Sequence, residues 1–119
     1  MQWALDKTRP ICPQLCEQVC VRVAKGEFPP DTRLLSVREV AVAAGVNPNT
    51  VQRAFEQLER DGILYSVRGS GWYVSADTDK AKEILSALTK KKTAAYFAAM
   101  EALGFDVNAV KEVVKEWEK

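Results

Sequence analysis

The sequence contains no histidine among its 119 residues. Histidine is the most common general base in enzymes and the most common metal ligand, so its absence weighs against acid–base catalysis and against a histidine metal site. The chain also lacks a phosphate-binding glycine loop and a cluster of carboxylates at fixed spacing. We therefore expect no enzyme, no metal site and no cofactor.

Long apolar runs are absent as well. No stretch approaches the ~18–20 apolar residues that a membrane-spanning helix needs, and residues 1–10 lack the apolar core of a signal peptide. We therefore predict a cytoplasmic protein with no membrane partner. Apolar residues make up 47% of the chain and charged residues 28%, which is typical of a folded globular protein. The length suffices for one compact domain or for a small domain with an appendage.

The chain has almost no net charge, +1 from 17 basic and 16 acidic residues. Bulk electrostatics therefore gives no argument for nucleic acid as a partner. The basic residues are nevertheless unevenly distributed, because every arginine precedes residue 69 and most lysines follow residue 79. The forked arginine side chain suits phosphates and guanine edges, whereas lysine suits solvated helix surfaces. The two parts of the chain are therefore expected to have different functions.

Two short helices joined by a glycine turn are predicted in the middle of the chain. A capping-box pattern that begins at Ser36 starts a helix over 37–44, and a glycine ends it. Asn47 then offers an N-cap for a second helix that ends at residue 60 or 61. This arrangement is the outline of a helix-turn-helix.

Apolar periodicity predicts a further helix over 12–25, before this motif, and a short extended piece over 33–35. After the motif the period changes to two, which indicates paired strands over 63–67 and 72–74. The fold class is therefore mainly α with a small β-hairpin. We assign residues 1–75 to a winged helix-turn-helix DNA-binding domain.

The remainder of the chain, residues 76–119, predicts a short helical hairpin. A helix over 78–103 is followed by a break at Gly104 and by a last helix that Asp106 caps. The apolar residues of the last helix are spaced three, four and three apart, as in packed helix pairs. We assign this segment to dimerisation.

The second helix of a helix-turn-helix lies in the major groove, and its N-terminal residues reach the base edges. Asparagine and glutamine can bond adenine in bidentate fashion, and arginine can bond guanine in the same way. The candidate residues in this sequence are Asn47, Asn49, Thr50, Gln52 and Arg53. For Asn47 the favoured interpretation is a helix cap, which does not prevent a DNA contact.

Further DNA contacts are predicted next to this helix. Arg38 lies in the first turn of the preceding helix. The hairpin tip consists of Arg68, Gly69, Ser70 and Gly71, where an arginine and backbone amides can reach phosphates or a minor groove. A glycine-rich tip is common in ordinary β-turns, so this motif has weight only together with the others.

Several motifs in one order resemble the GntR family of bacterial regulators, and the short helical tail most resembles its YtrA subfamily. The resemblance implies a winged helix-turn-helix that binds an operator as a dimer, with Arg38, Asn49, Thr50, Arg53 and the wing 69–71 at DNA-facing positions. Asp31 and Leu35 depart from the family pattern, which has glycine and proline there. The motifs are 34–41, 45–55, 58–62 and 68–74.

The helical tail carries more apolar residues than two short helices can easily bury alone, so a second copy related by a two-fold axis is expected to cover them. The alternative is that the tail folds back on its own winged domain. A two-fold dimer implies a pseudo-palindromic operator with half-sites ~10 base pairs apart, or a multiple of that. The predicted interface consists of Leu88, Tyr96, Leu103, Val110, Val114 and Trp117.

The sequence thus predicts a homodimeric, sequence-specific transcription regulator, and we expect a repressor. A winged-helix module that contacts protein instead of DNA is the second hypothesis, against which the polar recognition face argues. Whether a small-molecule effector binds stays open.

Three cysteines, Cys12, Cys16 and Cys20, are spaced by four residues on the first predicted helix. An odd number argues against a disulfide framework. The thiols either pack as small apolar side chains or form a redox or soft-metal sensor linked to DNA affinity. Structural zinc sites seldom use successive helical turns, which favours packing.

Overall fold

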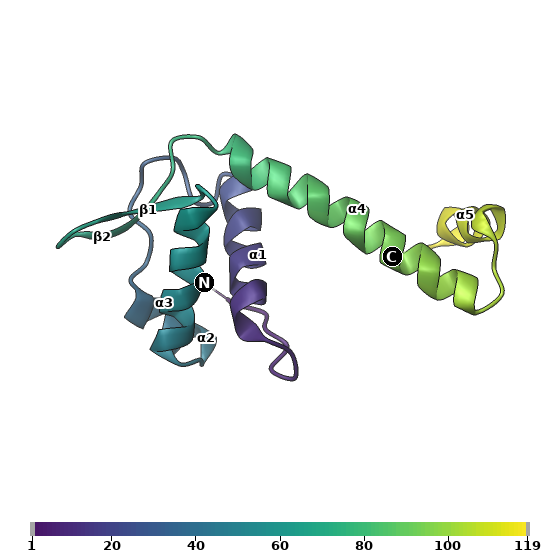
Figure 1. Ribbon diagram of the computed structural model, residues 1–119, viewed down its shortest axis with the longest axis horizontal. Helices are drawn as coiled ribbons and strands as arrows, with labels where there is room; N and C mark the ends of the chain where they lie inside the picture. The colour runs from purple at the N-terminus through teal and green to yellow at the C-terminus, as the bar shows by residue number, and fades with distance from the viewer. Residues whose placement is uncertain (1, 119) are drawn as a thin grey trace. The chain divides into compact units, whose positions relative to one another are not determined.

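The computed structural model describes residues 2–118, which form five helices and one two-stranded antiparallel sheet (Figure 1). A mainly helical chain with a small β-hairpin is therefore confirmed. In chain order the elements are α1 (Ile11–Ala24), α2 (Val37–Ala44), α3 (Pro48–Arg60), β1 (Leu64–Val67), β2 (Gly71–Val74), α4 (Asp79–Ala102) and α5 (Val107–Glu116).

The chain forms two compact units, one that extends to Leu85 and one that begins at Ser86. The first unit continues beyond residue 75 because the first turns of α4 belong to it. Ala81 is fully buried in its core, and Ile84 and Leu85 pack against that core. The functional division at residue 75 remains a prediction.

The ends of α2 and α3 are set by local hydrogen bonds. Ser36 Oγ accepts from the Glu39 amide at 3.1 Å, and Glu39 Oε1 accepts from the Ser36 amide at 3.1 Å, which completes the predicted capping box. Gly45 ends α2 with a φ of 68°, in the left-handed region that favours glycine. Asn47 Oδ1 accepts from the Asn49 amide at 2.8 Å, so the predicted cap of α3 is confirmed.

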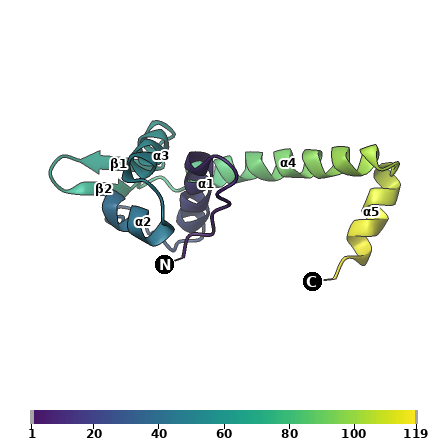
Figure 2. The ribbon, with the colours of Figure 1, turned by 90° about the horizontal axis from the view of Figure 1, so that it is seen from below.

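The core of the first unit forms where α3 packs against both α1 and α2. Figure 2 shows the three helices together, with the β1–β2 hairpin projecting from them. Phe55 is fully buried on α3 and contacts Trp72 of β2 edge to face, with ring centroids 5.7 Å apart. This contact fixes the hairpin to α3, since such an aromatic pair adds ~0.5–1.5 kcal/mol beyond area burial.

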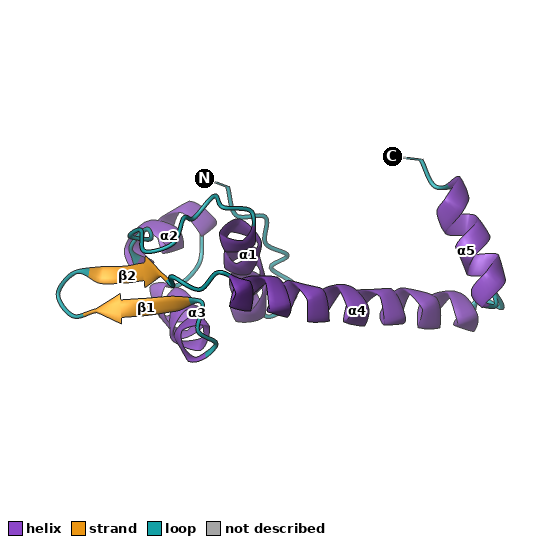
Figure 3. Cartoon of the chain, turned by 90° about the horizontal axis from the view of Figure 1, so that it is seen from above, coloured by secondary structure: helices purple, strands orange, loops and turns teal. Residues whose placement is uncertain are grey.

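The hairpin is joined by a third extended segment. β1 and β2 pair from Leu64–Val74 to Val67–Gly71, and the segment before α2 adds an antiparallel bridge between Arg33 and Tyr73. The antiparallel strand pair and its connecting loop are visible in Figure 3. The short extended piece predicted at 33–35 therefore lies alongside β2.

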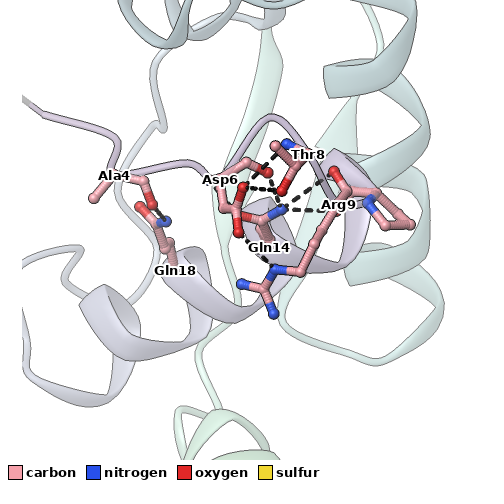
Figure 4. A network of polar contacts seen from close by, with 7 residues as sticks. Ala4, Asp6, Thr8, Arg9, Gln14 and Gln18 are labelled. Atoms are coloured by element: carbon pink, nitrogen blue, oxygen red, sulfur yellow. Dashed lines mark hydrogen bonds and ion pairs between the residues drawn. The ribbon is translucent and has the colours of Figure 1, made fainter.

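The segment before α1, for which the sequence predicts no helix or strand, packs against the rest of the first unit. Trp3 is buried, with 9% of its surface exposed, and the Arg22 guanidinium lies 4.2 Å from its ring centroid. Gln14 Oε1 accepts a hydrogen bond from the Asp6 amide at 2.8 Å, and Gln14 Nε2 donates to the Asp6 carbonyl at 2.8 Å, as Figure 4 shows. These contacts hold the segment on α1.

In the second unit, the last part of α4 is followed by a turn and by α5, whose N-cap is Asp106 as predicted. Val110 of α5 is buried, with 1% exposed. The unit buries few other apolar side chains, since Leu103 is 72% and Trp117 is 69% exposed. Several large apolar side chains of this unit are therefore exposed.

Candidate nucleic-acid interface

The N-terminal half of α3 carries the polar residues predicted to reach base edges. Asn49 and Arg53 are exposed, while Thr50 and Gln52 are half-buried. The opposite face of the helix, which carries Val51 and the other apolar residues, is buried against α1 and α2. The polar residues are therefore directed away from the core. Asn47 is exposed, and its side-chain oxygen is occupied by the helix cap.

Arg38 lies in the first turn of α2, one residue after the start of the helix, and is exposed. Arg38, Arg53 and Arg68 make no hydrogen bond or ion pair with any other residue in the described range 2–118. Each therefore keeps its guanidinium donors available for an external anion.

The other four arginines have partners within the protein. Arg9 pairs with Asp6 at 3.1 Å, and Arg60 donates to Gln57 at 2.8 Å. Arg22 contacts the Trp3 ring and lies 3.9 Å from Glu27. Arg33 donates from Nε to the Ser70 carbonyl at 3.0 Å. The three arginines predicted to face DNA are thus the ones without a protein partner among residues 2–118.

The tip of the hairpin forms a tight turn, in which the Ser70 amide donates to the Val67 carbonyl at 2.9 Å. Gly69 and Gly71 have φ values of 80° and 121°, which a side chain rarely permits. A Cβ added at Gly69 would meet nothing within 4 Å, so the backbone there is open to a close approach. Arg68 is exposed next to it.

Ser70 differs from the expectation of a free contact residue. It is half-buried, its hydroxyl pairs with the Tyr73 hydroxyl, and its carbonyl accepts from Arg33. Arg33 and Tyr73 were not identified from the sequence as part of the site. The β-bridge joins these two residues across a long sequence separation. The extended pattern of 33–35 was the only local sequence feature that indicated a strand there.

Asp31, the first departure from the family pattern, has a φ of 59°. This left-handed conformation explains why glycine suits the position. The Asp31 carboxylate accepts from the Tyr65 hydroxyl at 3.1 Å, a contact that glycine could not make. Leu35, the second departure, packs half-buried against the core.

The predicted interface residues of the second unit fall into two groups. Tyr96, Leu103, Val114 and Trp117 are exposed. Tyr96 and Val114 line one hollow of about 440 Å³ together with Phe97, which the sequence analysis did not single out. Val110 is buried inside the unit, and Leu88 is half-buried.

The three cysteines lie along α1 as predicted and are free thiols. Burial raises the pKa of Cys16 to about 12 and that of Cys20 to about 11. Cys16 Sγ also donates to the Ala54 carbonyl at 3.5 Å. Within residues 2–118 no group of three or more His, Cys, Asp or Glu side chains could hold a metal ion. No helix in the same range is long and apolar enough to cross a membrane.

A family model described as "Bacterial regulatory proteins, gntR family" matches residues 14–74, from α1 to the end of β2. The chain belongs to the GntR family. It is 32% identical over 110 residues to the uncharacterized HTH-type transcriptional regulator YhcF of Bacillus subtilis, covering 92% of this chain and 91% of YhcF. The helix-turn-helix and hairpin are therefore those of a transcription regulator, and the expectation that the chain is not an enzyme is confirmed.

The YtrA-like character is also confirmed. The chain is 44% identical over 66 residues to the HTH-type transcriptional repressor YtrA of Bacillus subtilis, which is 56% of this chain and 51% of YtrA. A solved GntR family transcriptional regulator from Listeria monocytogenes covers 96% of this chain and 100% of its own, with a TM-score of 0.84 and 32% identity. This GntR chain thus has a winged-helix fold.

A DNA complex is known for a more distant GntR structure. The AraR DNA-binding domain in complex with operator ORE1 matches 63% of this chain and 94% of its own, with a TM-score of 0.54 and 28% identity. DNA binding is thus a property of the GntR winged helix that this chain shares.

Proposed function

We propose that this GntR chain is a homodimeric repressor that binds a pseudo-palindromic operator through α2, α3 and the wing at 68–71. The observation that carries the proposal is the distribution of arginine partners. Arg38, Arg53 and Arg68 are exposed without a partner among residues 2–118, on the two helices and the hairpin tip that the motif uses for DNA. The AraR–operator complex and the repressor YtrA support this assignment.

In this proposal Asn49, Thr50, Gln52 and Arg53 read base edges in the major groove. Asn49 and Gln52 suit adenine, and Arg53 suits guanine. Asn47 caps the helix, and the helix N-terminus itself favours a phosphate group. Arg38 and the wing bind the DNA backbone, which sets the register of the recognition helix. The base contacts therefore supply specificity, and the other contacts supply affinity.

The second copy is proposed from the exposed apolar side chains of the second unit. Leu103 and Trp117 are mostly exposed, and Tyr96 and Val114 line an open hollow. Isolated exposed apolar residues are ordinary on a protein surface, but several on one short segment indicate a partner surface. A two-fold pairing of this unit would give the protein two recognition helices, one for each half-site of an inverted repeat.

Selection from a pool of random duplexes tests the DNA proposal. We expect enrichment of an inverted repeat whose half-sites lie ~10 base pairs apart or a multiple of that. Against the selected duplex, Arg53→Ala should weaken binding ~5- to 100-fold and relax the preference at one position. Arg60→Ala removes the same charge at the far end of α3 and should bind as the parent does. If no sequence is enriched from the pool, the proposal fails.

Sedimentation equilibrium tests the dimer. The double variant Leu103→Ser with Trp117→Ser should sediment as a monomer, because burying each apolar side chain contributes ~1.5–3 kcal/mol. Val42 is 80% exposed on α2, so Val42→Ser is a matched apolar control outside the second unit and should leave the dimer intact. A parent chain that is monomeric at all concentrations contradicts this part of the proposal.

In vitro transcription tests the sign of regulation. With the selected duplex placed over a promoter, the added parent chain should lower transcript yield, and Arg53→Ala should not. An increase in transcript from the same template, or from one with the duplex upstream of the promoter, would identify an activator.

A further inference from the structure

We infer that Arg33 is a positioning residue of the wing, which fixes the hairpin tip in the conformation that binds DNA. The inference rests on the proposed function, because it concerns how the wing takes part in operator binding. It goes beyond that function by assigning a role to a residue outside α2, α3 and the tip.

The backbone around Arg33 is anchored to the hairpin. The Leu34 amide donates to the Trp72 carbonyl at 2.8 Å, and the Val74 amide donates to the Thr32 carbonyl at 3.0 Å. These bonds flank the bridge between Arg33 and Tyr73. The Cα of Arg33 is therefore fixed relative to β2, and its side chain starts from a defined point on the sheet.

The side chain of Arg33 runs along the face of the sheet to the hairpin tip and lies beside Gly71. Arg33 and Tyr73 are bridge partners, and Tyr73 and Tyr65 are paired in register, so the three side chains share one face of the sheet. A Cβ added at Gly71 would lie 3.5 Å from Arg33 Nε and 3.6 Å from Nη2. The guanidinium thus lies directly against the Gly71 backbone and donates to the Ser70 carbonyl at 3.0 Å.

Ser70 is held from two directions. Arg33 binds its carbonyl, and the Tyr73 hydroxyl pairs with its hydroxyl. The Tyr73 ring is in turn stacked on Tyr65 at a centroid distance of 5.6 Å. A single residue between two glycines with positive φ values would otherwise be free to change conformation. The contacts therefore fix the peptide that joins Ser70 to Gly71 and limit the conformations of the tip that carries Arg68.

A fixed tip should raise the affinity for the operator, because a flexible tip has to lose conformational entropy when it docks on DNA. A preformed tip has already lost that freedom, so more of its contact energy appears as affinity. The effect of Arg33 should therefore depend on the contact that the tip makes through Arg68. Residues that act through one another give non-additive losses, whereas independent contacts give multiplied losses.

A double-mutant cycle on the selected duplex tests the inference. Arg33→Ala and Arg68→Ala should each weaken binding about tenfold, the loss that corresponds to one charge-assisted hydrogen bond. The double variant should lose little more than either single variant, on the order of 10- to 20-fold in all. A loss on the order of 100-fold would show two independent contacts and would overturn the inference.

The salt dependence of binding separates positioning from a direct phosphate contact. Arg68→Ala should lower the slope of log K against log[salt] by ~1. In that background, Arg33→Ala should leave the slope unchanged if Arg33 acts through the tip. A further drop of ~1 would place Arg33 itself on a phosphate and would overturn the inference.

Controls keep the result independent of folding and of the proposed function. Arg33 is exposed, so Arg33→Ala should unfold within a few degrees of the parent, and binding is measured well below every unfolding midpoint. Tyr73→Phe removes only the second support of Ser70 and should weaken binding in the same direction. If the parent binds and Arg53→Ala binds more weakly, but Arg33→Ala binds as the parent, this inference alone fails. If the parent binds no duplex, the proposed function itself fails.

Discussion

Treating the folded chain with an aromatic disulfide at neutral pH would test whether the cysteines of α1 are reactive. Desolvation by burial raises the pKa of the Cys16 thiol from 9.0 to about 12, with smaller contributions from Cys12, Cys20 and Asp61. The same cause raises the pKa of Cys20 from 9.0 to about 11. A thiol reacts as its thiolate, so both should be slow.

The expected rate follows from two opposing effects. At neutral pH, raising a thiol pKa by three units lowers the thiolate fraction ~1000-fold. A more basic thiolate is also a better nucleophile, and a Brønsted coefficient of ~0.4–0.5 recovers about 20-fold of the loss. Cys16 should therefore react about 50-fold more slowly than a free cysteine, and the same reasoning gives about tenfold for Cys20. Restricted access to the buried sulfur slows both further.

The assay is peptide mapping by mass spectrometry after an acid quench at several times. The chain unfolded in urea and a short single-cysteine peptide supply the reference rates. The sign of the pH dependence is a second check. The rate at Cys16 should go on rising through pH 9 to 12, because its pKa is about 12, whereas the peptide should level off near its own lower pKa.

A Cys16 rate equal to that of the peptide would refute the reasoning, and loss of operator binding on modification of Cys16 would favour the sensor interpretation. Modification of Cys16 could affect DNA binding through its contact with the Ala54 carbonyl, since Ala54 belongs to α3, the proposed recognition helix. The raised pKa values favour the other interpretation, in which the thiols pack as apolar groups.

Three further predictions concern stability. Ser36→Ala removes the α2 cap and should cost ~1 kcal/mol, or about 4 °C in Tm, while Ser86→Ala in the interior of α4 should cost nothing measurable by calorimetry. Asp31→Ala keeps the strain of the left-handed backbone and loses the hydrogen bond to Tyr65, so it should destabilise the fold by ~1 kcal/mol. Asp31→Gly loses the same bond but relieves ~1–2 kcal/mol of strain, so it should unfold near the parent. Equal losses of stability for the two variants in urea titrations would disprove this. Val110→Ala should cost ~2 kcal/mol and speed amide exchange in α5, unlike Val107→Ala at an exposed position; equal exchange rates would contradict the burial of Val110.

The helix-turn-helix could be predicted closely because its boundaries depend on chemistry within three or four residues. The capping box at Ser36, the glycine stop at Gly45 and the cap at Asn47 each satisfy backbone groups at a helix end. Such signals are complete in the local sequence. The bounds of α2 and α3 in the structure accordingly agree with the predicted ones.

Contacts across long separations could not be predicted in the same way. Trp3 is buried through contacts with α1, and Lys7 donates to the Gly45 carbonyl at 2.8 Å, although the first residues show no periodicity. The bond from Arg33 to Ser70 spans the whole helix-turn-helix. No local pattern encodes these pairs, because they depend on the fold that the other elements build first.

The near-zero net charge of the chain is compatible with DNA binding once the arginines are divided by their partners. Arg9, Arg22 and Arg60 have donors occupied by acidic, amide or aromatic groups, so they are less available to an external anion. Arg38, Arg53 and Arg68 have no partner among residues 2–118, so their donors are available to an external anion. Non-specific affinity depends on how many phosphates a protein neutralises, so the proposed interface, with three such arginines, predicts weak non-specific binding. Specificity is the ratio of the affinity for the operator to the affinity for other DNA. Such a chain should therefore distinguish its operator well when base contacts of α3 supply a large share of the binding energy.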